Sequence, residues 1–121
     1  MLAHCRTLAV LAGFIVTVAA QPGAKPPAPK VDFARQIRPL LSDNCFACHG
    51  PDEKSRASGL RLDLKADVLA ARKNGPAVVP GKPEQSLVYQ RLVTTVKGKK
   101  MPPVYSHKEV KPEQIELVKR W

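Results

Sequence analysis

The sequence predicts an all-α fold built from short helices and long loops. Apolar residues recur at helical spacing in several short segments, and no segment has a convincing strand pattern. The connecting segments are rich in the chain's 12 Pro and 7 Gly residues, which interrupt regular structure. The length of 121 residues is that of one domain.

The first 20 residues are expected to be a secretory signal peptide. MLAHCR carries one Arg and no acid, and the apolar run from Thr7 to Ala20 ends in the small residues Val-Ala-Ala. The run is short for a membrane span, which needs about 20 apolar residues. We therefore expect cleavage and export to the periplasm or cell surface, with no transmembrane span. A retained segment would instead tether the protein to the membrane.

Residues 21–30, QPGAKPPAPK, are expected to form an extended cationic linker, because Pro-rich segments favour that conformation. The folded domain should then cover 31–121. Its last helix lacks a C-terminal Gly or Asn and ends on Trp121. We therefore expect a domain truncated at its C-terminal helix, belonging to a longer protein.

The first helix is expected over residues 31–44, VDFARQIRPLLSDN. Asp32 is a plausible N-cap, and apolar residues follow at helical spacing. Pro39 lies inside this segment and predicts a kink or a restart, because proline lacks the N–H that a helix interior uses.

Three further helices are expected after a polar loop at 50–59. The second helix should cover about 63–73 and stop at Asn-Gly-Pro. A short helix should begin at Ser86, and the last should cover 112–121 with proline at its first position. An irregular loop at 96–110 separates these two helices.

The formal charge of +10 is spread along the chain and is densest at Lys97, Lys99 and Lys100. It favours solubility and attraction to an acidic partner. Nucleic acid is not an expected partner, because the few aromatic residues are not interleaved with basic ones.

The heptapeptide NCFACHG contains Cys45 and Cys48, the cysteines left after loss of Cys5 with the signal, and His49. Structural zinc needs four ligands, and only His107 would remain to join them. A thioredoxin-like pair would follow a strand, whereas this pair follows a helix. CxxCH is the signature of c-type haem attachment, in which the thiols form thioethers and the histidine is the proximal iron ligand.

The opposite face of such a haem needs a ligand, which is commonly Met in electron-transfer cytochromes. Met101 is the one Met beyond the signal, and the KKMPPV segment around it is stiffened by two prolines. We therefore expect Met101 as the distal ligand. The competing residues are His107, Lys99 and Lys100.

A covalently attached haem would also account for the long loops, because its porphyrin adds apolar surface to a small core. The expected haem walls are Leu60, Leu62, Leu92, Val96 and Val104, and the candidate propionate partners are Arg56, Arg61 and Arg91.

Several segments together resemble the planctomycete-type cytochrome c domain, the N-terminal module of large exported proteins. They are FARQIRPLLSDNCFACHGPDEKSRASGLRLD, KPEQSLVYQRL, KKMPP and PEQIELVKRW. The resemblance covers nearly all of the chain from Val31. It implies a compact mono-haem cytochrome c fold whose first and last helices pack together. It also implies haem attachment at Cys45 and Cys48, with His49 and Met101 as axial ligands.

We therefore expect an exported domain that binds one haem c and transfers single electrons to unidentified, acidic redox partners. No acid–base pair or activated nucleophile indicates that this domain is itself an enzyme. One alternative is a haem enzyme or sensor whose distal ligand leaves the iron. The other is a basic binding module, stapled by haem, that captures a polyanion such as an acidic sugar.

Overall fold

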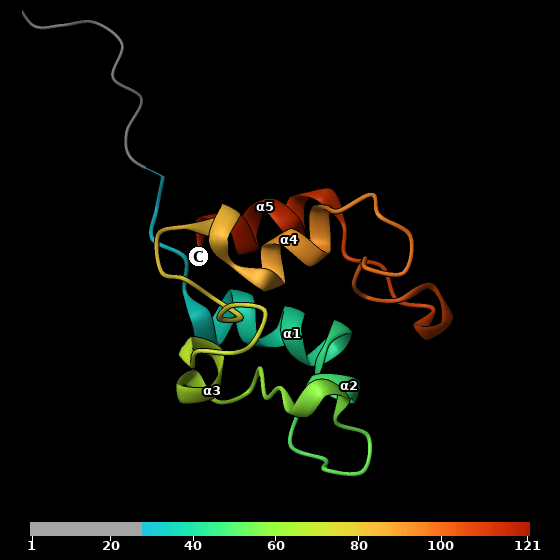
Figure 1. Cartoon of the computed structure of the whole chain (residues 1–121). Coiled ribbons are helices and arrows are strands. Elements are labelled where there is room, and N and C mark those ends of the chain that lie inside the picture. Colours follow the sequence, from blue (N-terminus) through green and yellow to red (C-terminus); the bar gives the residue numbers. More distant parts are fainter. Residues whose placement is uncertain (1–27) are drawn as a thin grey trace, which may run out of the picture.

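Helices and connecting loops make up the folded part of the chain. A computed structural model describes residues 28–121 (Figure 1). No strand occurs among these residues, which confirms the predicted all-α class. The α-helices are α1 (Arg38–Asn44), α2 (Phe46–His49), α3 (Lys65–Leu69), α4 (Leu87–Val93) and α5 (Pro112–Arg120). A π-helical turn, η1 (Phe33–Ile37), precedes α1, and the 3₁₀ turns are η2 (Ala57–Gly59), η3 (Pro83–Gln85) and η4 (Val104–Ser106).

The expected signal peptide at 1–20 lies outside the described residues, as does the linker as far as residue 27. The last three linker residues, Ala28 to Lys30, are exposed and have no regular structure. Within residues 28–121, no helix has the length and apolar character that a membrane crossing requires.

The first helical segment begins and restarts where the sequence predicts. Asp32 Oδ1 accepts the N–H of Arg35 at 3.1 Å, and the Asp32 N–H donates to Gln36 Oε1 at 2.8 Å. The π-helical turn η1 then gives way to α1, in whose first turn Pro39 lies. Proline is tolerated there because the first N–H groups of a helix have no intrahelical acceptor. The predicted restart at Pro39 is confirmed.

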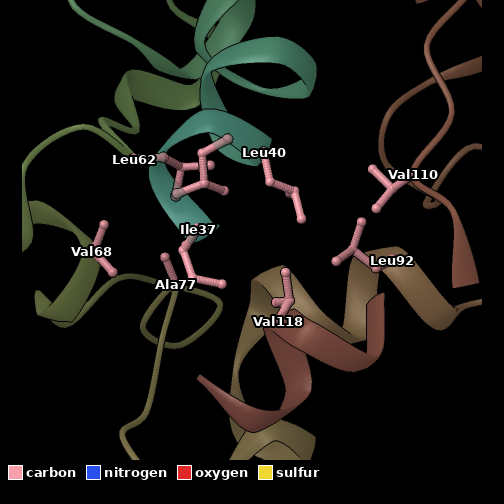
Figure 2. Packing of buried hydrophobic residues seen from close by; sticks show 9 residues of the cluster. Ile37, Leu40, Leu62, Val68, Ala77, Leu92, Val110 and Val118 are labelled. Carbon is pink, nitrogen blue, oxygen red and sulfur yellow. The ribbon is translucent and has the colours of Figure 1, made fainter. Parts of the chain in front are cut away.

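The hydrophobic core forms where η1 and α1 meet α4 and α5 (Figure 1). Ile37 and Leu41, one helical turn apart, are 0% and 1% exposed and are its largest fully buried side chains. Figure 2 shows apolar side chains from these elements pointing toward one another. The other buried apolar residues are Leu40, Leu62, Val68, Ala77, Leu92, Val110 and Val118.

The two ends of the described chain pack against each other. The rings of Phe33 in η1 and Trp121 after α5 have centroids 5.5 Å apart, at an interplanar angle of 30°. Aromatic pairs in this distance range contribute about 0.5–1.5 kcal/mol beyond the area they bury. This contact confirms the packing of the first and last helices.

One predicted helix is much shorter than expected. The sequence predicts a helix over about 63–73, whereas α3 covers only Lys65–Leu69. Ala70 leaves the helix with a ψ of 144°, and the chain continues as a loop. The carboxylate of Asp67 binds groups outside α3, and Val68 is the one buried residue of this helix. Tertiary contacts therefore decide the length of α3.

Replacing Leu41 by Ala should lower the free energy of unfolding by about 2–5 kcal/mol, because it leaves a cavity in a fully buried part of the core. Urea unfolding of the purified protein would measure this. Leu64→Ala is the matched control, since Leu64 is 43% exposed and should tolerate the change. Equal losses for the two variants would contradict the core described here.

Candidate haem-binding site

Cys45, Cys48 and His49 lie on one tight turn at the end of the first helical segment. The Cys45 N–H donates to the Leu41 carbonyl at 2.7 Å, which ties the turn to α1. The Cys45 carbonyl accepts the N–H groups of Cys48 at 3.1 Å and His49 at 2.8 Å. Both thiols are free and half-buried. The structure thus brings together three of the four predicted ligand and attachment residues with both thiols unpaired.

His49 is half-buried, and its carbonyl accepts the N–H of Leu62 at 2.8 Å. Its Nδ1 is buried and has no hydrogen-bond partner in the described part of the chain. Burial lowers the pKa of His49, although the Ala57 carbonyl acts in the opposite direction. Neutral imidazole is the form that binds a metal. His49 therefore fits the role of an iron ligand.

Burial also raises the pKa of the Cys45 thiol to about 11, although the charge of Lys108 opposes this shift. Cys45 accordingly stays protonated at neutral pH and packs against the hydrophobic core. A thiol with a raised pKa is not a reactive thiolate. Together with the orphaned Nδ1 of His49, the free thiols fit covalent haem attachment better than redox chemistry at sulfur.

A zinc site finds less support in this arrangement. Between residues 28 and 121, no group of three or more His, Cys, Asp and Glu side chains gathers in a way that could hold a metal ion. His107, the remaining ligand in that hypothesis, is exposed in the turn after η4, with a φ of 53°.

Gly50 closes the CxxCH turn where no side chain fits. It is buried, and a Cβ added there would lie 2.3 Å from the Phe46 carbonyl oxygen. Because that oxygen belongs to the backbone of α2, the turn would have to shift to make room. A glycine after His49 is therefore part of the geometry that presents the cysteines and the histidine.

Gly50→Ala should destabilise the protein by about 1–3 kcal/mol, the usual cost of overpacking a closely packed site. It should also lower the yield of haem-loaded protein, measured as haem absorbance per chain. Ala47→Ser is the control, because Ala47 lies in the same turn and is exposed. Normal loading and stability of Gly50→Ala would show that the turn adapts easily.

Met101 lies in the long loop between α4 and α5, and its side chain is half-buried. Its N–H donates to the Arg91 carbonyl of α4 at 2.9 Å, and Arg91 Nη1 donates to the Lys99 carbonyl at 3.2 Å. The competing side chains of Lys99, Lys100 and His107 are exposed. The axial role of Met101 stays a prediction.

A long-range contact links the Met101 loop to the CxxCH turn. Lys108 Nζ donates to the carbonyl of Asp43, near the C-terminal end of α1. A cation at a helix C-terminus satisfies a carbonyl that has no intrahelical partner. Figure 1 shows α2 and this loop on the same side of the molecule. The loop that carries Met101 is thus attached two residues before Cys45.

The expected haem walls divide into two groups. Leu62 and Leu92 are buried, and Leu60 packs against the same core. Val96 and Val104 are 52% and 94% exposed. Two hollows in the described part of the chain are lined instead by residues from 78–89 and 118–121 and by residues from 28–31 and 120–121. None of these is a predicted site residue.

The three arginines expected near the propionates have partners within the chain. Arg61 Nη2 lies 2.5 Å from Asp63 Oδ2, and this hydrogen bond lowers the pKa of the carboxyl. Arg56 donates to the carbonyls of Gly50 and Pro51, and Arg91 donates to that of Lys99. These arginines connect loops around the site.

Sequence reasoning missed Arg72, whose charge acts on His49. The residue lies in the segment that the sequence predicts as a helix over about 63–73. Because α3 ends at Leu69, Arg72 lies in the loop that follows the helix.

A comparison with known families decides the kind of site. The family model described as Planctomycete cytochrome C matches residues 45–104, from the first cysteine of CxxCH to just beyond Met101. Through this segment the chain belongs to the planctomycete cytochrome C family. No curated protein and no solved structure matches the chain.

Membership of the planctomycete cytochrome C family confirms the resemblance stated from the sequence. It indicates a domain that binds haem c covalently and carries electrons rather than acting as an enzyme. Helices without strands in residues 28–121 agree with this assignment.

Proposed function

We propose that this domain binds one haem through thioethers to Cys45 and Cys48, with His49 and Met101 as axial ligands, and transfers single electrons outside the cytoplasm. The observation that carries the proposal is the CxxCH turn, which holds two free thiols beside a half-buried His49 whose Nδ1 has no hydrogen-bond partner in the described part of the chain. The family match supports it, because the matched residues include both this turn and Met101. The haem supplies an iron that cycles between Fe(III) and Fe(II).

The task of the turn is to fix the position of the haem edge and the proximal ligand. Backbone hydrogen bonds from Cys48 and His49 to one carbonyl set the spacing of the two thiols. The bond from Leu62 to the His49 carbonyl fixes the backbone of the ligand to the following segment. Such supporting contacts orient a ligand and tune the metal that it binds.

The task of the Met101 loop is to present a thioether from a firmly held backbone. Its N-terminal part is attached to α4 by the bond from Met101 to Arg91 and by the bond from Arg91 to Lys99. Its C-terminal part is attached by Lys108 to the end of α1 and by the buried Val110 to the core. A methionine ligand favours the reduced iron and raises the potential.

The proposed ligation leaves no open position on the iron for a substrate or a gas, so it favours electron transfer over the haem enzyme or sensor. The proposed partner is an acidic redox protein. Lys97, Lys99 and Lys100 are exposed in the loop that carries Met101, where they would steer a negatively charged surface toward the site. Such steering weakens as salt is added.

Absorption spectra of the protein, produced in a periplasm with haem-attachment machinery, test this proposal. We expect low-spin spectra in both oxidation states and the weak far-red sulfur-to-iron band in the oxidised form. We also expect a one-electron redox titration and no binding of carbon monoxide to the reduced protein. Rapid carbon monoxide binding without the far-red band would instead support the enzyme or sensor. Polyanion binding together with a potential outside any physiological range would support the basic module.

A further inference from the structure

Arg72 and Asp67 form an ion pair beside the proximal segment. Asp67 Oδ2 accepts from Arg72 Nη2 at 2.5 Å and from the N–H of Arg61 at 2.6 Å. The side chains are only 25% and 28% exposed. The carboxylate therefore fixes the guanidinium and the backbone before Leu62 at the same time.

The guanidinium reaches from this pair to the turn η2. Arg72 Nη1 and Nη2 each lie 3.5 Å from a carbonyl oxygen, those of Ser58 and Gly59. The neighbouring carbonyl of Ala57 acts on the His49 ring, and the N–H of Leu62 binds the His49 carbonyl. Arg72 and His49 thus both contact the short segment 57–62.

Packing of the helix that contains His49 also connects the histidine to the cation. Helix α2 contacts η2, the turn whose carbonyls the guanidinium reaches. Burial is the main cause of the lowered pKa of His49, and the charge of Arg72 acts in the same direction. The helix that contains His49 and the guanidinium of Arg72 therefore both contact the turn η2.

We infer that Arg72, which Asp67 holds in place, raises the reduction potential of the iron bound to His49 through its positive charge. The inference rests on the proposed function, since it needs His49 as a ligand. Oxidised iron carries one more positive charge than reduced iron, so a fixed, partly buried cation nearby disfavours oxidation. Asp67 moderates this effect by its opposite charge and supports it by fixing the guanidinium.

Reduction potentials of purified haem-loaded variants test the inference. Arg72→Gln should lower the potential, Arg72→Lys should keep it near that of the unaltered protein, and Asp67→Asn should raise it. The matched controls are Arg35→Gln and Asp32→Asn, which remove the same charges from an exposed pair, 3.9 Å apart, in the first helical segment. Asparagine also remains a good N-cap at position 32. The controls should move the potential less than the Arg72 and Asp67 variants.

A structural role alone predicts a different pattern. If Arg72 and Asp67 only hold loops together, both substitutions should lower thermal stability and shift the potential in the same direction or no more than the controls. Either result would overturn the inference. If Asp67→Asn does not fold, a difference in potential between Arg72→Gln and Arg72→Lys that exceeds the control shift supports it, and a smaller difference overturns it.

The spectrum of the unaltered protein separates this inference from the proposed function. Absence of covalent haem, or of a histidine-ligated low-spin spectrum, would contradict the proposed function before any variant is compared. Normal spectra with no selective effect of Arg72 would overturn the inference alone.

Discussion

Replacing Met101 by Ala should leave the haem attached to the chain and remove the far-red sulfur-to-iron band from the oxidised spectrum. The reduced protein should then bind carbon monoxide, because the distal position loses its thioether. The potential should fall by on the order of 0.1 V, within the roughly 0.8 V range that axial ligands span. Absorption spectra and a redox titration of the purified variant would measure all three effects.

Val104→Ala is the matched control, because Val104 lies three residues further along the same loop and is 94% exposed. Its spectrum and potential should equal those of the unaltered protein. A Met101→Ala variant that keeps the far-red band and excludes carbon monoxide would reject Met101 as the ligand. His107, Lys99 and Lys100 would then be tested in its place.

Replacing Cys45 and Cys48 together by Ala should abolish covalent haem attachment almost completely. Alanine is preferred to serine here because Cys45 packs against the core. An unpaired hydroxyl there would lower the stability of the fold for a reason unrelated to haem. Haem extracted from the denatured variant should separate from the chain, whereas it should stay with the unaltered protein. Haem staining after denaturing electrophoresis would measure the difference.

The single variants test the contribution of each cysteine separately. Cys45→Ala and Cys48→Ala should each retain at most one thioether and therefore attach haem at a reduced yield. Ala47→Ser, between the two cysteines and exposed, should attach haem normally. Full covalent attachment in the double variant would place the linkage elsewhere and contradict the proposed site.

The parts of the fold that could be predicted depend on local signals. Asp32 caps the first segment, Pro39 lies in the first turn of α1, and Pro112 is the first residue of α5. Each effect acts within one turn of the residue concerned, so the sequence around it contains the necessary information. The packing of Phe33 on Trp121 joins residues far apart in the sequence and was implied only by the family resemblance.

The length of α3 could not be predicted, because distant partners decide it. Asp67 and Arg72 fit a helical pattern, but Asp67 binds the N–H of Arg61, and Arg72 reaches toward the carbonyls of η2. These contacts form only when residues 57–72 fold together. The same reason explains why Arg61 has a carboxylate partner in Asp63, although it was expected near a propionate.

Only part of the candidate site could be predicted from the sequence. Cys45, Cys48 and His49 could be identified because haem attachment requires a fixed spacing within five residues. The role of Gly50 depends on the Phe46 carbonyl, and the role of Arg72 depends on the fold of its segment. Neither contact can be recognised from the sequence, because each depends on how the backbone around the residue folds.

The intact mass of the purified protein under denaturing conditions tests the central claim most directly. Covalent attachment at Cys45 and Cys48 predicts the mass of the polypeptide plus one haem, and digestion should assign the added mass to the peptide that contains both cysteines. The same spectrum would show whether residues 1–20 have been removed. The mass of the polypeptide alone, with free haem released on denaturation, would contradict the assignment of this domain as a covalent haem carrier.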